Sequence, residues 1–230
     1  METMTSLLVR SRVKLDEVSA RRWQDSHIAQ WLYDGARDAC RKAECLRDSV
    51  TVTAVAGTQT YALTSTGIKD LIRINRVTYK QVGQTDEIPL EYADYNSLDS
   101  MSWATTQQTR PTIYTTWGFP PSVSLVLYPA PSDAGTITIY YYRLPSNAVV
   151  TDYSQNLELP QGWEDIAIDY AVYQALLQDA DPRWKEYKGI YDEHLSDMVV
   201  TAIRFNDQAG MMNVGQNGAV PRWLWDEGYY

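Results

Sequence analysis

The spacing of apolar residues near the N-terminus predicts a helical segment from about Leu15 to Leu46. Asp25 or Ser26 is expected to cap this helix, because a short polar side chain can accept a hydrogen bond from the first backbone N–H groups. Apolar positions that recur at intervals of three and four residues place their side chains on one helix face. These positions are Ile28, Leu32, Ala36, Ala39 and Ala43. We therefore assign residues 1–48 to N-terminal helices.

Residues 49–147 follow a different pattern, which predicts β-strands. Apolar and polar residues alternate in 50–55, Gly57 indicates a turn, and 58–63 again has strand character, so a β-hairpin is predicted. A short helix is expected within 91–103, where apolar residues have helical spacing. The further strands are predicted at 71–79, 113–117, 123–128 and 136–143. Such a series of short strands is typical of a small antiparallel sandwich or barrel.

Residues 148–208 are predicted to be helical again. Pro160 suits the first turn of one helix, and Asp181-Pro182 is typical of a cap followed by the first residue of another. The fold class that results is α+β. We expect one helical bundle formed by the N- and C-terminal segments, with the antiparallel β-sandwich or barrel inserted between them. An extended C-terminal tail, residues 209–230, completes the chain.

The end of the chain is unusually rich in aromatic residues. A glycine-rich stretch, 210–218, precedes four large aromatic side chains within 221–230. Terminal residues usually fray unless something holds them, and Trp, Tyr and Arg dominate the energetics of protein interfaces. We predict a flexible arm that docks into a partner protein; the alternative is that it folds back onto its own core. The candidate docking residues are Pro221, Arg222, Trp223, Leu224, Trp225, Tyr229 and Tyr230.

The distribution of charge restricts the function further. The chain has a net charge of −9. Residues 151–230 contain 5 Lys and Arg against 14 Asp and Glu, so this segment alone carries the whole net charge. Proteins that grip nucleic acid neutralise phosphates with basic side chains, and the sequence contains no basic stripe. Tight binding to DNA or RNA is therefore not expected. Because no apolar run approaches the length of a membrane span, membrane insertion is not expected. Secretion is not expected either, because the apolar patch at residues 7–9 is too short for the core of a signal peptide.

Candidate chemistry is sparse. Motifs for phosphate cradles, zinc proteases and serine hydrolases are absent from the sequence. His194 lies on the apolar stripe of its helix and is interpreted as a packed, hydrogen-bonded core residue, whereas His27 is expected at the surface. Cys40 and Cys45 lie five residues apart in the predicted helix and should point in different directions, without bridging or binding zinc. No catalytic residue, cofactor site or metal site is predicted.

One alternative is an acid–base hydrolase. Asp165 and Asp169 are spaced to face the same side of a helix, with Glu164 beside them, and paired carboxylates of this kind allow acid–base catalysis. Acidic residues in a first helical turn also interact favourably with the helix dipole. We prefer this structural interpretation.

Three stretches, taken in order and spacing, resemble the adaptor proteins of tailed bacteriophages, also called head-completion or connector proteins. These are distantly related to the tail-tubular ring proteins of short-tailed phages. The likeness covers most of residues 15–205. Gly35 departs from it, because the family tends to keep a helix former there. The first stretch is Leu15-Asp16 with 22–37; the second is 57–63, 71–77, Arg110-Pro111 and 127–131; the third is 157–160, 166–175 and Asp179.

The resemblance implies a non-enzymatic structural protein of the virion neck, present in the host cytoplasm during assembly. It implies a head-to-tail adaptor that forms a ring of about twelve copies between portal and tail, around the DNA channel. The implied partners are the portal protein, further copies of the chain, a downstream tail or nozzle protein, and passing genomic DNA without tight binding. C-terminal segments of the family hook onto portal subunits, and residues 221–230 correspond to them.

An acidic channel wall would let the duplex slide without sticking. The candidate residues for such a wall are Glu164, Asp165, Asp169, Asp192, Glu193 and Asp197. A second alternative to the adaptor is a neck or tail binding module that contacts a fibre or a host surface through the aromatic-rich β-region.

Overall fold

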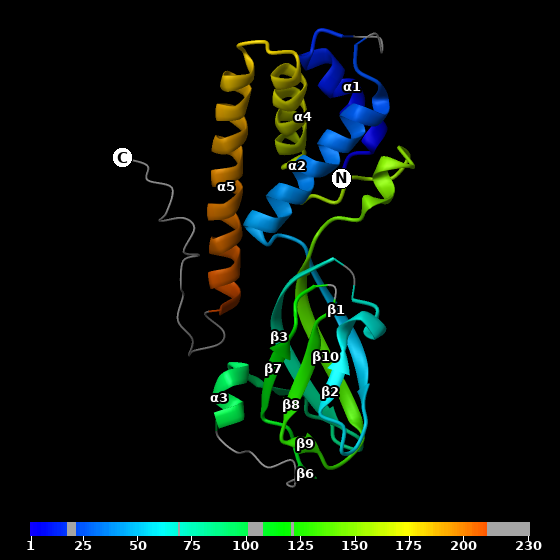
Figure 1. Cartoon of the computed structure of the whole chain (residues 1–230), viewed down its shortest axis with the longest axis vertical. Coiled ribbons are helices and arrows are strands. Elements are labelled where there is room, and N and C mark those ends of the chain that lie inside the picture. Colours follow the sequence, from blue (N-terminus) through cyan, green and yellow to red (C-terminus); the bar gives the residue numbers. More distant parts are fainter. Residues whose placement is uncertain (18–21, 69, 101–107, 121, 211–230) are drawn as a thin grey trace, which may run out of the picture.

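The computed structural model describes residues 1–17, 22–68, 70–100, 108–120 and 122–210, and has two parts along its long axis (Figure 1). Helices from both ends of the chain form one part, and strands from the middle of the chain form the other. The predicted α+β class is therefore confirmed. No helix among the described residues is long and apolar enough to cross a membrane.

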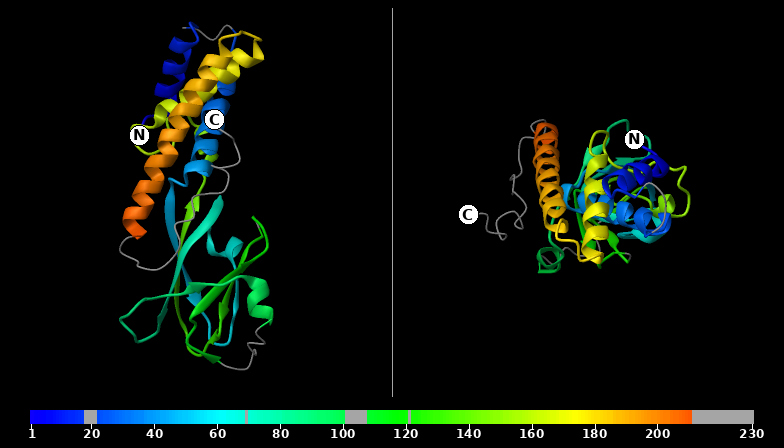
Figure 2. Two further views of the ribbon diagram at one scale, coloured as in Figure 1. Left: turned by 90° about the vertical axis from the view of Figure 1, so that its left-hand side faces the viewer. Right: turned by 90° about the horizontal axis from the view of Figure 1, so that it is seen from above.

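The helical part brings the two ends of the chain together around one hydrophobic core (Figure 2). Helix α4 packs against all three of the other helices, so its wide apolar face is buried on several sides. The helices before and after the β-region therefore bury their apolar faces against each other in this shared core. The four helices are α1 (Met4–Lys14), α2 (Asp25–Ala43), α4 (Glu164–Gln178) and α5 (Trp184–Gly210).

The N-terminal boundaries differ from the predicted ones. Where a helix was predicted from residue 15, the chain instead ends α1 and reverses at Asp16, whose φ is 55°. Helix α1 lies within the range assigned to N-terminal helices but before the helical segment predicted from residue 15, and it buries Leu7 and Leu8. The N-cap of α2 is Gln24, which makes no side-chain cap hydrogen bond. Asp25 instead lies in the first turn and accepts a hydrogen bond from Nε of Arg12 at 3.0 Å. The predicted Asp25 or Ser26 cap is therefore wrong.

Two other local predictions have different outcomes. Pro160 precedes α4, which begins at Glu164, so the predicted position in the first helical turn is wrong. The side chain of Asp181 accepts a hydrogen bond from the backbone N–H of Arg183 at 3.0 Å, just before α5. Asp181 therefore accepts a bond of the predicted kind, but Pro182 is not the first residue of the helix as predicted, because α5 begins at Trp184.

Gly35, the residue that departs from the phage-adaptor pattern, has a packing role. A Cβ atom at this position would lie 2.6 Å from Cβ of Tyr170. Glycine therefore allows α2 to approach α4 closely, at the cost of some helix propensity.

The β part contains two four-stranded sheets and a short two-stranded ladder in the described residues. The first sheet has the order β1 (Arg47–Ala54), β10 (Gly135–Arg143), β3 (Leu71–Gln81) and β4 (Ile88–Pro89). The second has the order β2 (Thr60–Ala62), β8 (Ser124–Tyr128), β7 (Ile113–Trp117) and β5 (Glu91–Tyr92). The ladder pairs β6 (Gln108–Thr109) with β9 (Ala130–Pro131). One buried cluster contains residues of both sheets, so the sheets share a core.

The predicted strands are largely present, but their pairing differs. Strands at the four separately predicted positions correspond to β3, β7, β8 and β10, and the expected short helix is α3 (Tyr95–Ser100). The predicted hairpin is wrong, because β1 pairs with β10 and β2 pairs with β8. At the turn between them, the hydroxyl of Tyr61 accepts from the N–H of Val55 at 3.1 Å and donates to the carbonyl of Thr58 at 2.9 Å. These bonds hold a corner that carries the chain from one sheet to the other.

The predicted purely antiparallel arrangement is also wrong, since β5 pairs with β7 and β6 pairs with β9 in parallel. The strand orders of the described sheets do not close into a barrel.

The two crossings between the parts lie side by side. The backbone N–H of Arg143 donates to the carbonyl of Leu46 at 3.0 Å, which joins the end of β10 to the start of β1. The Arg143 guanidinium also forms a two-point ion pair with Glu158, at 2.9 and 3.1 Å. This hydrogen bonding outweighs burial and lowers the pKa of Glu158. The junction is therefore fastened by both backbone and charged contacts.

Candidate functional site

The acidic residues at the start of α4 lie against the N-terminal segment. Asp165 is exposed and forms an ion pair with Arg10 of α1. Glu164 is buried; it accepts a hydrogen bond from the N–H of Gly162 at 2.7 Å and lies 3.7 Å from the N-terminal amine of Met1. Both carboxylates therefore help to hold the N-terminus onto α4.

Asp169 is fully buried between three helices. One carboxylate oxygen is 2.6 Å from Nζ of Lys14 in α1, and the other is 2.8 Å from Nδ1 of His194 in α5. A buried carboxylate is costly unless it is paired and hydrogen-bonded, and these two contacts meet that need. His194 is hydrogen-bonded as predicted, but its side chain is 43% exposed. The predicted packed core position is wrong, because the ring lies at the edge of the helix contact.

The remaining acidic candidates lie on α5. Asp192 pairs with Lys188 one turn earlier, whereas Glu193 and Asp197 are exposed and form no ion pair within the described residues. Since Glu164 and Asp169 are buried, only the other four candidates can contribute to an acidic surface. Their role as a channel wall stays a prediction. The three carboxylates of α4 considered for a hydrolase make the contacts expected of helix packing.

The predictions for His27 and the cysteines have opposite outcomes. His27 is exposed, as expected. The two cysteines do not point in different directions: Sγ of Cys40 and Sγ of Cys45 are 3.5 Å apart. Helix α2 ends at Ala43, and Glu44 adopts a left-handed conformation (φ 47°) that turns Cys45 back toward the helix. The contact with Cys45, together with burial, raises the pKa of Cys40.

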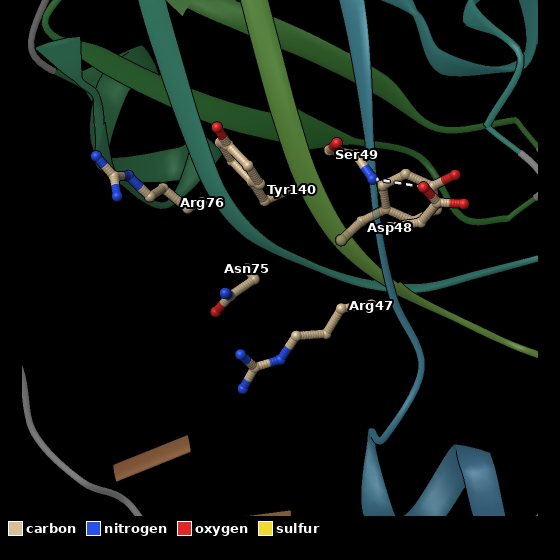
Figure 3. Close-up of a pocket in the computed structure, with 7 residues that line it drawn as sticks. Arg47, Asp48, Ser49, Asn75, Arg76 and Tyr140 are labelled. Carbon is tan, nitrogen blue, oxygen red and sulfur yellow. Dashed lines mark hydrogen bonds between the residues drawn. The ribbon is translucent and has the colours of Figure 1, made fainter. Parts of the chain in front are cut away.

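A shallow pocket on the first sheet contains two arginines, Arg47 and Arg76, together with Asp48, and we call the face that carries the arginines the basic sheet face (Figure 3). Residues directly opposite each other in paired strands lie on the same face. By this register, Arg47, Tyr142 and Arg73 form one row, and Ser49, Tyr140 and Arg76 form the next. The Arg47 and Arg73 guanidinium carbons lie 5.4 and 5.2 Å from the centre of the Tyr142 ring.

The charges of this face are only partly compensated. Arg73 forms an ion pair with Glu44, with 2.9 Å between Nε and Oε1. Arg47 and Arg76 are exposed and make no ion pair in the part of the chain that the structure describes. Figure 3 shows these two side chains extending away from the strands, with Asn75 between them. The face therefore presents two available guanidinium groups.

An apolar groove adjoins the basic sheet face where the C-terminal half of α5 passes the end of α2. Phe205 is 67% exposed there. Arg47 lines both the groove and the basic sheet face, so the two surfaces are continuous. We call this groove the α5 groove; its lining residues are Glu44, Cys45, Arg47, Pro160, Trp163, Met198, Thr201, Ala202 and Phe205.

The α5 groove and the basic sheet face were not predicted. Their residues come from segments that are far apart in the sequence, and no local pattern connects Arg47 or Arg76 with Phe205. The predicted docking residues from Pro221 to Tyr230 lie outside the described residues, so their role stays a prediction.

Comparison with known proteins identifies one relationship. A family model described as SU10 adaptor protein matches residues 3–216 of the chain. This range includes every described helix and strand of both parts. No curated protein matches the sequence.

Proposed function

Since the chain belongs to the SU10 adaptor protein family, whose members are structural proteins of phage particles, we propose that it is a head-to-tail adaptor. In this proposal about twelve copies form a closed ring between portal and tail, around the path of the DNA. The observation that carries the proposal is the match of the family model to nearly the whole chain. Contacts with other head or tail proteins follow from family membership.

The surface chemistry supports a passage that does not retain DNA. The net charge of −9 opposes contact with a polyanion, and Glu193 and Asp197 are exposed without cation partners among the described residues. We expect no measurable binding of random duplex DNA at physiological salt, where basic non-specific binders show Kd values of about 10⁻⁴ to 10⁻⁶ M. A salt-sensitive affinity in that range would contradict an inert channel.

We further propose that residues 221–230 attach each subunit to the portal. Trp223 and Trp225 would supply hot-spot side chains, each contributing about 2 kcal/mol or more when buried in a partner pocket. Repetition of the contact around a ring would raise the total strength of attachment.

The test is assembly on purified portal. The isolated protein is expected to be mainly monomeric at micromolar concentration and low salt, because like charge keeps subunits apart, and to form rings when portal is added. Sedimentation and electron microscopy would detect this change.

Replacing both Trp223 and Trp225 with Ala should abolish attachment while the thermal melt remains cooperative. Normal decoration of portal by this variant would contradict the docking role, and a stable ring without portal would contradict template dependence.

A second function has one observation in its favour. The β part exposes a group of aromatic residues at the end of β7: Trp117 is 58% exposed and Phe119 is 83% exposed. The rings of Tyr95 and Trp117 stack at 4.5 Å between centroids. Such a patch suits a binding module that contacts a fibre or host surface. Labelling the protein in virions would distinguish the two, because an adaptor lies directly beneath the portal.

A further inference from the structure

The α5 groove leaves apolar surface open between α5 and the end of α2. Met198 forms its buried floor, while Phe205 stands 67% exposed at its edge. Contiguous exposed apolar surface in a soluble protein marks an interaction site. The groove is therefore suited to large apolar side chains.

The adjoining basic sheet face favours an occupant that also carries negative charge. Arg47 and Arg76 make no ion pair in the described part of the chain, although the whole protein is acidic. Guanidinium groups bind carboxylates through directed, paired hydrogen bonds. An occupant of the combined surface should therefore carry bulky aromatic residues next to acidic ones.

The chain itself contains such a segment, in the residues that follow α5. Phe205 lies near the end of α5, which ends at Gly210, and residues 211–230 follow. About twenty residues can span up to roughly 65 Å when extended, so 221–230 can return to the groove from this point. This segment has the sequence Pro-Arg-Trp-Leu-Trp-Asp-Glu-Gly-Tyr-Tyr, in which two Trp residues directly precede two acids.

We propose that, in the free subunit, residues 221–230 dock intramolecularly on this surface. Trp223 and Trp225 occupy the α5 groove, and Asp226 and Glu227 pair with Arg47 and Arg76. The proposal goes beyond the adaptor function, because it concerns the subunit before assembly. It also gives the segment two exclusive positions, one on its own subunit and one on the proposed portal partner.

A modest intrinsic affinity is sufficient for this docking. A short tether gives an effective concentration on the order of 1 mM. If the segment bound the surface with a Kd of about 0.1 mM as a separate peptide, it would be docked roughly ten times more often than free. Because proteolysis of a docked segment follows the population of the open form, cleavage within it should be roughly tenfold slower than in a free peptide.

Arg222 provides a built-in reporter, because trypsin cleaves after it and removes residues 223–230. The experiment follows this loss by intact mass in the full-length protein and in a synthetic peptide of residues 211–230. We expect cleavage after Arg222 to be about tenfold slower in the protein. Equal rates in protein and peptide would overturn the proposal. Slow cleavage that becomes slower as protein concentration rises would also overturn it, because the occupant would then be the segment of a second copy.

Variants locate the docking surface without altering the cleaved sequence. Phe205→Ala and Arg47→Ala should each raise the rate of cleavage after Arg222 severalfold. The matched controls are Phe119→Ala, an exposed aromatic residue in the β part, and Lys80→Ala, an exposed basic residue at the far end of the same sheet face. The controls should cleave at the wild-type rate. If all four variants cleave alike, the segment does not dock on this surface.

The affinity for portal gives an independent measurement, in which the two kinds of variant should change in opposite directions. Since docking on the subunit competes with docking on portal, Phe205→Ala should bind portal several times more tightly than wild type, whereas the Trp223→Ala, Trp225→Ala variant should lose binding. The trypsin experiment requires no portal, so its failure would leave the adaptor proposal intact. Weaker portal binding by Phe205→Ala would overturn the competition.

Discussion

The helical part and the β part differ in the kind of polar side chain that they bury. The helical core contains buried charges, namely Arg12, Glu164 and Asp169, whereas the polar residues buried in the β part are the neutral Thr78 and Thr115. This difference arises because the two parts are formed from different stretches of the chain. The β part is a continuous segment, in which registers of paired strands define the neighbours. The helical part joins two distant ends of the chain, and its ion pairs connect those ends.

The ion pairs of the helical part therefore determine which helices pack together, in addition to stabilising their contacts. Lys14 and Asp169 are separated by 155 positions, and Tyr191 donates a hydrogen bond to Asp38 at 2.6 Å across 153 positions. Apolar helix faces can pack in several registers, but a buried carboxylate without its cation is strongly unfavourable. These contacts favour one arrangement of α1, α2, α4 and α5 over others.

The largest expected effect comes from removing the buried carboxylate. Asp169→Ala leaves Lys14 and His194 without their partner and opens a gap between three helices. We expect a loss of about 3 kcal/mol in unfolding free energy, the lower end for broken buried pairs, because both partners are partly exposed. Denaturant unfolding measures it. Exposed Asp86 serves as control, and Asp86→Ala should change little. Equal small effects of both changes would show that the pairing does not define the helical part.

A smaller effect is expected at the contact of α2 with α4. Gly35→Ala places a Cβ atom within 2.6 Å of Tyr170, and overpacking of this kind costs about 2 kcal/mol. Gly189→Ala on α5 is the matched control, because nothing lies within 4 Å of its added Cβ. This control should instead gain up to about 1 kcal/mol from helix propensity. Thermal melts of the two variants should shift in opposite directions, and shifts of the same sign would contradict the close approach.

Local and distant contacts also differ in how far the sequence predicts them. Strands such as β3, β7, β8 and β10 were predicted because alternation is a local signal. Their pairing was not, because it depends on distant residues: β1 joins β10 rather than the adjacent β2. The acids of α4 were recognised as one helical face, but the partners Arg10 and Lys14 lie before residue 15, where the predicted helical spacing begins.

The thiols and the α5 groove show two other limits. Cys40 and Cys45 were expected to diverge on a continuous helix, and the left-handed Glu44 ended that helix between them. The α5 groove exists only because Trp163 and Phe205 are brought to the ends of α2 and β1 by tertiary packing. Neither feature has a signature in local sequence.

A pH dependence should distinguish the two parts. Burial alone would raise the pKa of Asp38, but hydrogen bonds from Tyr191, Lys42 and Arg41 outweigh it and lower the pKa. A group with a lowered folded pKa stabilises the protein above its unfolded pKa, and this contribution is lost as pH falls through the folded value. Asp38→Asn should therefore cost about 1.5 kcal/mol near neutral pH, as for hydrogen bonds to a charged group.

The difference between wild type and Asp38→Asn should shrink as pH falls below about 4, where carboxylates become protonated. Thermal melts at a series of pH values measure it, again with Asp86→Asn as control. A difference that stays constant down to pH 3 would show that the charge of Asp38 is not what links α2 to α5.

The smallest expected effect lies in the β part. Thr115 is fully buried in β7, and its hydroxyl has no hydrogen-bond partner among the described residues. Valine has nearly the same shape, and it removes a buried hydroxyl that contributes no contact. Thr115→Val should therefore raise the unfolding free energy by about 0.5–1 kcal/mol, which corresponds to an increase in Tm of roughly 1–4 °C. Because the β core depends on shape and register rather than on paired charge, this polar-to-apolar change is tolerated where Asp169→Ala is not. A loss of stability in Thr115→Val would show that the β core also depends on a polar contact at this position.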